Sequence, residues 1–80
     1  MVKRPYTTRQ GQALAFIHYY TKIHGEPPAE MDIARYFRIS PPAAHQLVVS
    51  LENRGLIERI PGRARSIRVL LARSELPDLE

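Results

Sequence analysis

The chain has 80 residues, of which 44% are hydrophobic and 25% charged, and its formal net charge is +4. This length corresponds to one small domain, and the composition is that of a folded globular protein rather than a disordered chain. Cysteine is absent, which excludes disulfides and thiolate metal sites, and the longest apolar run, Ala13 to Ile17, is far too short to span a membrane.

The first predicted helix begins at a capping box, in which Thr7 caps the helix and Gln10 reaches back to it. The helix is expected to run to about His24, because Gly25 is a typical C-terminal stop and Pro27-Pro28 cannot continue it. Its buried stripe is predicted to consist of Ala13, Leu14, Ile17 and Tyr20.

A short second helix is predicted from about Ala29 to Phe37, followed by a turn at Arg38. Such a turn usually takes a glycine, because a positive φ is unfavourable for residues with a side chain, so we expect this turn to be either slightly strained or differently shaped. Ser40 is predicted to cap a third helix that starts with Pro41 and Pro42. One buried face of this helix is predicted from the spacing of Ala44, Leu47, Val48 and Leu51.

Gly55 ends the third helix, and two strands are predicted after it, Leu56 to Ile60 and Ser66 to Leu70, joined through Pro61-Gly62. The predicted fold is therefore mainly α with a small β-hairpin, a three-helix winged helix-turn-helix. Residues 1–71 are assigned to this domain. Residues 72–80 are predicted to be a flexible acidic tail.

Positive charge is concentrated near the hairpin, since residues 54 to 73 contain six arginines and a single acid. Helices of this kind with a basic hairpin are typical of proteins that place the third helix, here about residues 41–54, in the major groove of duplex DNA. The hairpin, about residues 59–68, then lies on the backbone or in the minor groove. The predicted DNA-contacting residues are Arg35, Arg38, Ser40, Pro42, Ala43, His45, Gln46, Ser50, Arg63 and Arg65.

The predicted contacts on the third helix differ in their chemistry. Gln46 is the best candidate for reading a base, since its amide can bind N6 and N7 of adenine together; the alternative is an exposed glutamine without a partner. His45 either donates to guanine N7 or a phosphate, or is an unpaired surface histidine. Pro42 and Ala43 offer apolar contact to a thymine methyl group. Ser40 either only caps the helix or also helps its free amides to bind a phosphate.

The predicted arginine contacts are with the DNA backbone. Arg63 and Arg65 are expected at the hairpin tip, where they reach phosphates or a narrow minor groove. Arg35 and Arg38 are expected to clamp the backbone beside the turn. If about five to seven phosphates are neutralised, the logarithm of the binding constant should fall with the logarithm of salt concentration with a slope of about −5 to −6.

Together these segments resemble the N-terminal DNA-binding domain of LexA-type repressors, over roughly Thr7 to Leu71. The segments that carry the resemblance are, in chain order, Thr7-Thr8-Arg9-Gln10, Gly25-Glu26-Pro27-Pro28, Ile33-Ala34, Ser40-Pro41-Pro42-Ala43-Ala44, Leu51-Glu52-Asn53-Arg54-Gly55-Leu56-Ile57 and Pro61-Gly62-Arg63-Ala64-Arg65-Ser66-Ile67-Arg68. The resemblance implies a sequence-specific, duplex-DNA-binding transcriptional repressor of a bacterium, phage or plasmid, located in the cytoplasm with the nucleoid.

The chain departs from the family pattern in three ways. Its turn lacks the usual glycine and is one residue shorter. Pro42, His45 and Gln46 stand where the family often has asparagine and glutamate, so a different operator is expected. The chain also stops where the family's self-cleaving C-terminal domain, with its main dimer interface, begins. Self-cleavage is therefore not expected of it, and we expect at most a weak homodimer on DNA, or association with a longer regulator or a partner protein.

Other functional classes are less compatible with the sequence. His18, His24 and His45 lack metal-ligand spacing, and no HExxH motif or glycine-rich phosphate loop is present, so no metal, cofactor or enzymatic activity is predicted. No membrane partner is expected. The main alternative is a winged helix that binds another protein instead of DNA; apolar Pro42, Ala43 and Val49 favour it, and the hairpin arginines disfavour it.

Overall fold

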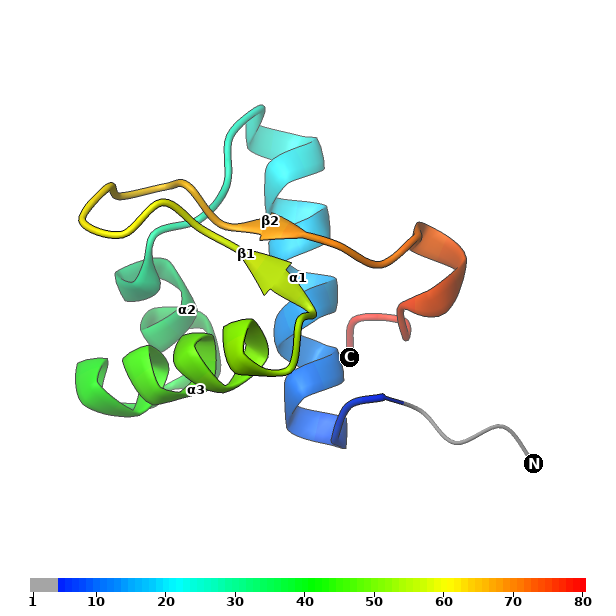
Figure 1. Ribbon diagram of the computed structural model, residues 1–80, viewed down its shortest axis with the longest axis horizontal. Coiled ribbons are helices and arrows are strands. Elements are labelled where there is room, and N and C mark those ends of the chain that lie inside the picture. The colour runs from blue at the N-terminus through cyan, green and yellow to red at the C-terminus, as the bar shows by residue number, and fades with distance from the viewer. Residues whose placement is uncertain (1–4) are drawn as a thin grey trace.

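The structure is a computed structural model that describes residues 5–80. Its helices are α1 (Thr8–His24), α2 (Glu30–Phe37) and α3 (Pro41–Asn53), followed by the strands β1 (Ile57–Glu58) and β2 (Arg68–Val69) and a single 3-10 turn, η1 (Arg73–Glu75). In Figure 1, α2 and α3 lie to one side of α1, and the hairpin loop projects to the same side. The predicted mainly α winged helix-turn-helix is confirmed. Among residues 5–80, no helix is long and apolar enough to cross a membrane. The first four residues of the predicted 1–71 domain lie outside the described part.

α1 begins and ends at the predicted residues. The Gln10 amide donates to the Thr7 hydroxyl oxygen at 3.1 Å, and the Thr7 amide donates to the Gln10 side-chain oxygen at 2.9 Å, which completes the capping box. Gly25 ends the helix with a φ of 78°, a value that glycine adopts without strain. The predicted stripe is buried at its first three positions, whereas Tyr20 is only partly buried.

α2 and α3 form the helix-turn-helix unit. α2 starts one residue later than predicted, so that Ala29 precedes the helix. The amide of Ala29 donates to the Asp32 carboxylate at 2.8 Å. Arg38 in the turn has a φ of 56°, so a residue with a side chain occupies the left-handed conformation, as the sequence led us to expect. The Ser40 hydroxyl oxygen accepts the Ala43 amide at 3.2 Å and caps α3. The four residues predicted to face inward are all buried, namely Ala44, Leu47, Val48 and Leu51.

The hairpin is shorter than predicted. Only Ile57↔Val69 and Glu58↔Arg68 pair in the antiparallel ladder, so the predicted strands of five residues each were too long. The ladder stops because the amide of Ile60 donates to the Ser66 hydroxyl oxygen at 3.0 Å rather than to a backbone carbonyl. The loop between the strands is therefore closed by a side chain instead of by strand pairing.

Residues 72–80, predicted as a flexible acidic tail, lie against α1 in the structure. The Tyr6 hydroxyl donates to the carbonyl of Glu75 at 2.7 Å, and the Gln12 side chain bonds the backbone of Asp78 and of Glu80 at 2.9 and 2.8 Å. Leu76 is 8% exposed and joins the core. These contacts cover α1 around Gly11, beside Tyr6 and Pro77, whereas Phe16 packs against the rings of Tyr36 and Phe37 of α2. Helix α1 therefore buries more residues than the single predicted stripe.

We predict that Leu76→Ala lowers the free energy of unfolding by about 2 kcal/mol, because it removes buried methyl groups from the core. Leu70→Ala is the matched control, since Leu70 is 45% exposed. Urea unfolding of both variants measures the difference. A packed C-terminal segment requires a clear gap between them, whereas equal, small effects would support the flexible tail.

We also predict that Arg38→Gly raises the free energy of unfolding by about 0.5–1 kcal/mol, because it removes the side chain from a left-handed position. Arg35→Gly, three residues earlier and inside α2, should instead lower it by about 1 kcal/mol. Thermal and urea unfolding report both values. A loss of stability in Arg38→Gly comparable to that in Arg35→Gly would show that the turn carries no strain.

Candidate nucleic-acid interface

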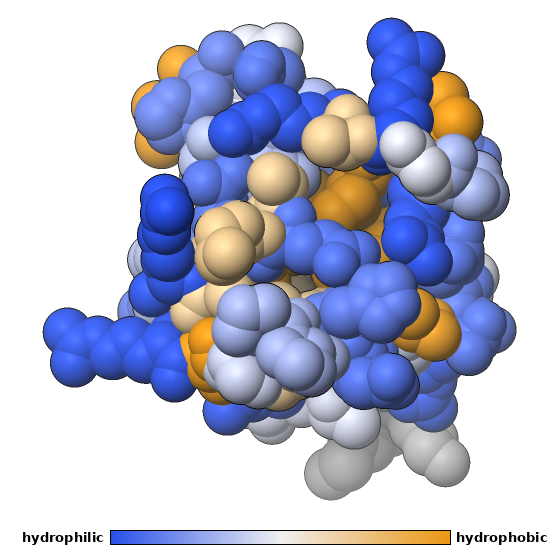
Figure 2. All heavy atoms as spheres, turned by 90° about the vertical axis from the view of Figure 1, so that its left-hand side faces the viewer, coloured by the Kyte–Doolittle hydropathy of each residue, from blue (hydrophilic) through white to orange (hydrophobic). Residues whose placement is uncertain are grey.

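The exposed side of α3 contains most of the residues predicted to meet DNA. Ser40, Pro42, Ala43, His45 and Gln46 are all exposed, and they lie at the start of the helix. In Figure 1 this end of α3 and the hairpin loop are on the same side of the molecule, and that side faces the viewer in Figure 2. Most of the face is hydrophilic, with smaller hydrophobic areas between. The structure therefore brings these five residues together on one accessible surface.

Ser50, the sixth predicted residue of this helix, is placed differently. It is partly buried, and its hydroxyl donates to the carbonyl of Leu47 at 2.7 Å. The side-chain amide of Gln10 approaches the same hydroxyl oxygen at 3.4 Å. Ser50 thus lies at the edge of the exposed surface, next to α1, and its hydroxyl already has partners within the protein.

The first turn of α3 has no free amide for an anion. Pro41 and Pro42 carry no N–H group, and the amide of Ala43 is bonded to the Ser40 hydroxyl. The amide of Ala44 donates to the Ser40 carbonyl at 2.9 Å. The proline pair thus removes two donors and the cap uses the third, which favours plain helix capping by Ser40 over a phosphate contact through free amides.

His45 is oriented by an acidic residue that sequence reasoning missed. Its Nδ1 atom lies 3.1 Å from both carboxylate oxygens of Glu30, the first residue of α2. Glu30 is also 3.6 Å from the guanidinium of Arg59, whose Nε donates to Glu52 at 3.0 Å. This ion-pair network joins α2, α3 and the hairpin. No sequence signal pointed to it, because its members lie far apart along the chain.

Arg35 and Arg38 are exposed at the end of α2 and in the turn that precedes α3. Among residues 5–80, neither has a carboxylate within ion-pair distance. Both guanidinium groups are therefore available to an external anion beside the start of α3.

The two arginines predicted at the hairpin tip have different surroundings. Arg63 is exposed, and its carbonyl accepts the Ser66 hydroxyl at 2.9 Å. Arg65 is also exposed, but it has a φ of 56°, and its Nη1 donates to the Tyr20 hydroxyl at 3.1 Å and lies 3.2 Å from the Asp32 carboxylate. The hydrogen bond to Tyr20 is the main cause that raises the pKa of Arg65, with Asp32 contributing. Only Arg63 projects freely from the loop.

The other arginines of residues 54–73 are also engaged. Arg54 donates to the Gln10 side chain at 3.1 Å, Arg68 pairs with Glu58 across the hairpin, and Arg73 bonds the Tyr19 hydroxyl. Within the described residues, Arg63 is the one arginine of this basic region whose side chain has no hydrogen-bond or ion-pair partner. The charge count of the sequence therefore overstates the positive charge that the hairpin presents.

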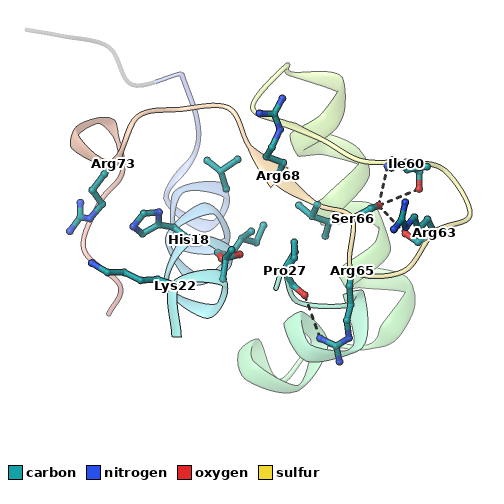
Figure 3. Close-up of a pocket in the computed structure, with 13 residues that line it drawn as sticks. His18, Lys22, Pro27, Ile60, Arg63, Arg65, Ser66, Arg68 and Arg73 are labelled. Carbon is teal, nitrogen blue, oxygen red and sulfur yellow. Dashed lines mark hydrogen bonds between the residues drawn. The ribbon is translucent and has the colours of Figure 1, made fainter. Parts of the chain in front are cut away.

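A hollow of about 820 Å³ separates the hairpin from the C-terminal half of α1. Figure 3 shows Lys22 and Arg73 on one side of it and Ile60 and Arg63 on the other. Of the described residues that line it, none belongs to α2 or α3. The hollow therefore lies apart from the exposed surface of α3, on the α1 side of the hairpin.

Comparison with known proteins links this geometry to a family. The family described as LexA DNA binding domain matches residues 3–66. The chain is 43% identical over 63 residues to the LexA repressor of Thermotoga petrophila, covering 79% of this chain and 32% of the relative. It is 45% identical over 69 residues to the LexA repressor of Pseudothermotoga lettingae, covering 86% of this chain and 34% of the relative. The chain thus spans about a third of the length of the curated relatives it matches.

The family match covers all three helices and the hairpin loop up to Ser66, so it includes both parts of the surface described above. The helix-turn-helix unit, whose second helix begins with two prolines, is followed directly by the hairpin and its arginine-containing loop. The chain belongs to the LexA DNA-binding domain family.

Proposed function

We propose that this chain binds double-stranded DNA through α3 and the hairpin loop, and that it acts as a transcriptional repressor. The observation that carries the proposal is the exposure, on one side of the molecule, of the start of α3 together with the unpaired arginines Arg35, Arg38 and Arg63. Membership of a family of DNA-binding domains supports the first part, and the naming of its relatives as repressors supports the second.

In the proposed complex α3 lies in the major groove with its first two turns against the base edges. Gln46 reads adenine through its amide, and Pro42 and Ala43 contact a thymine methyl group. His45, held by Glu30 at Nδ1, directs its other ring nitrogen to a guanine or a phosphate. Ser50 contributes only at the edge, since its hydroxyl already bonds within the protein. The base-reading residues are thus few, and a single copy should discriminate sequences modestly.

The phosphate contacts are proposed to come from side chains rather than from helix amides. Arg35 and Arg38 hold the DNA backbone beside the start of α3, next to the capping residue Ser40. Arg63 reaches a phosphate or the minor groove from the hairpin loop. Because one module makes so few contacts, we propose that two copies bind neighbouring half-sites on DNA.

A second candidate function is binding of another protein by the same helix surface. It is favoured by Pro42 and Ala43, which are exposed apolar residues at the centre of the surface. Exposed apolar groups at that place are equally suited to a protein partner. The two proposals differ in their salt dependence, because phosphate contacts release counterions and apolar contacts do not.

The experiment that tests the proposal is an NMR titration of labelled protein with a 20-base-pair duplex over a series of salt concentrations. Shifts should cluster on residues 38–46 and 60–66. Three free arginines predict a salt slope of about −3 for each bound copy, smaller than the basic residues of the sequence alone suggest. A protein-binding module would leave these resonances unmoved by DNA, and that result would reject the proposal in favour of the alternative.

Arg63→Ala should lower the magnitude of the salt slope by about 0.9, because one phosphate contact is lost. Lys22→Ala is the matched control: it removes the same charge from α1, on the other side of the hollow from Arg63. Fluorescence anisotropy with a labelled duplex gives the slope for each variant. Equal slopes for the two variants would mean that the hairpin does not meet the DNA backbone.

A further inference from the structure

We infer that Arg65 is a positioning residue that fixes the hairpin loop to α1 and α2 and thereby presents Arg63 to DNA. The inference rests on the proposed DNA binding and refines it. Sequence reasoning treats Arg63 and Arg65 as equivalent tip residues, whereas their environments in the structure differ. The distinction matters because a residue that holds the loop affects DNA affinity without contacting a phosphate.

The Arg65 side chain connects the loop to three separate parts of the chain. Its Nη1 donates to the Tyr20 hydroxyl on α1 at 3.1 Å and to the carbonyl of Pro27 at 3.4 Å. The same nitrogen is 3.2 Å from the Asp32 carboxylate on α2, and Nε is 3.8 Å from Glu26. One guanidinium therefore joins the hairpin loop to α1, to the segment that follows it, and to α2.

Little else holds the loop in place. A hollow of about 820 Å³ lies between the hairpin and α1, and a second of about 280 Å³ lies between the loop and the start of α2. The ladder beneath the loop has two paired residues in each strand. Ile60, at the edge of the loop, is 53% exposed and so packs only partly. At its two ends the loop is held by the bonds of Arg59 to Glu30 and Glu52 and by the burial of Ile67. Between these ends, it depends on Arg65 for side-chain bonds to the helices.

The backbone explains why Arg63 and Arg65 point in different directions. In an extended strand, residues two apart would project to the same side. Here Arg65 has a φ of 56°, and the Ser66 hydroxyl bonds the carbonyl of Arg63 at 2.9 Å, so the chain turns between the two arginines. Figure 3 shows Arg63 at the outer part of the loop and Arg65 directed at Pro27. Arg65 thus takes a conformation that is unfavourable for arginine while its side chain bonds Tyr20 and Asp32.

The charge of Arg65 is also compensated within the protein. Asp32 and Glu26 both lie within ion-pair distance, whereas no carboxylate does so for Arg63 among residues 5–80. Transfer of Arg65 to a phosphate would leave Asp32 without this partner, although Asp32 would still accept the amide of Ala29. Arg63 can bind a phosphate without breaking any such contact, so the two arginines should differ in their counterion release.

The first test compares the salt slopes of Arg65→Ala and Arg63→Ala, measured by anisotropy with a labelled 20-base-pair duplex. We expect Arg65→Ala to weaken binding about fivefold or more with the slope unchanged, whereas Arg63→Ala reduces the slope by about 0.9. Circular dichroism confirms that each variant is folded. A slope for Arg65→Ala reduced as much as that for Arg63→Ala, with the backbone order of the loop in the free protein unchanged, would make Arg65 a phosphate contact and overturn the inference.

A second test removes one hydrogen-bond partner of Arg65 and leaves the arginine itself in place. Tyr20→Phe deletes the hydroxyl that Arg65 bonds, and Tyr19→Phe is the matched control, since its hydroxyl bonds Arg73 outside the hairpin loop. Neither tyrosine belongs to the proposed DNA surface. We expect Tyr20→Phe to weaken duplex binding about threefold and Tyr19→Phe to leave it unchanged. Equal affinities for the two variants would reject a positioning role.

A measurement on the free protein separates this inference from the proposed function. Backbone ¹⁵N order parameters of residues 62–66 should be about 0.8 in the wild type and below about 0.6 in Arg65→Ala. If the wild type fails to bind the duplex, the proposed function is wrong whatever the loop does. If the wild type binds but the order parameters of the loop do not fall in Arg65→Ala, the proposed function stands and the positioning role is rejected.

Discussion

The burial of one face of α3 is the constraint that determines which residues form the proposed DNA-binding surface. Ala44, Leu47 and Val48 pack into the core, and the helical period then forces Pro42, His45 and Gln46 outward. α2, joined to α3 through the turn at Arg38, supplies most of the surface against which α3 packs, and β1 supplies a smaller part. A substitution that rotated α3 about its axis would therefore replace every residue of the proposed reading surface at once.

Features with local causes were predictable from the sequence, and features with distant causes were not. The Thr7 cap and the Gly25 stop follow from neighbouring residues and lie at the expected positions. The strand ends depend on the Ser66 hydroxyl reaching across the loop to Ile60, which no period-two pattern reveals. The place of Leu76 depends on contacts with the N-terminal part of the chain, more than 60 residues away along the sequence, as the bond between Tyr6 and Glu75 illustrates.

The charges of the site also have a part that the sequence predicts and a part that depends on distant contacts. Residues 54–73 contain six arginines, but the sequence does not reveal which acidic residues the fold places next to them. Glu30 and Glu52 reach Arg59 from two different helices, and Asp32 reaches Arg65 from α2. The positive charge available to a phosphate is therefore smaller than the formal charge of the segment, and its position is defined by Arg63 rather than spread along the hairpin.

The two prolines at the start of α3 both favour the helix start and remove its amide donors. Pro41 and Pro42 suit the first helical positions, because their fixed φ is helical and their missing amides would lack intrahelical partners anyway. The same missing amides remove the donors with which a helix start usually binds an anion. Positive charge at this end must then come from side chains, and Arg38, in its left-handed conformation, lies two residues before Ser40. The turn that lacks glycine thus carries a cation next to a helix start that lacks free amides.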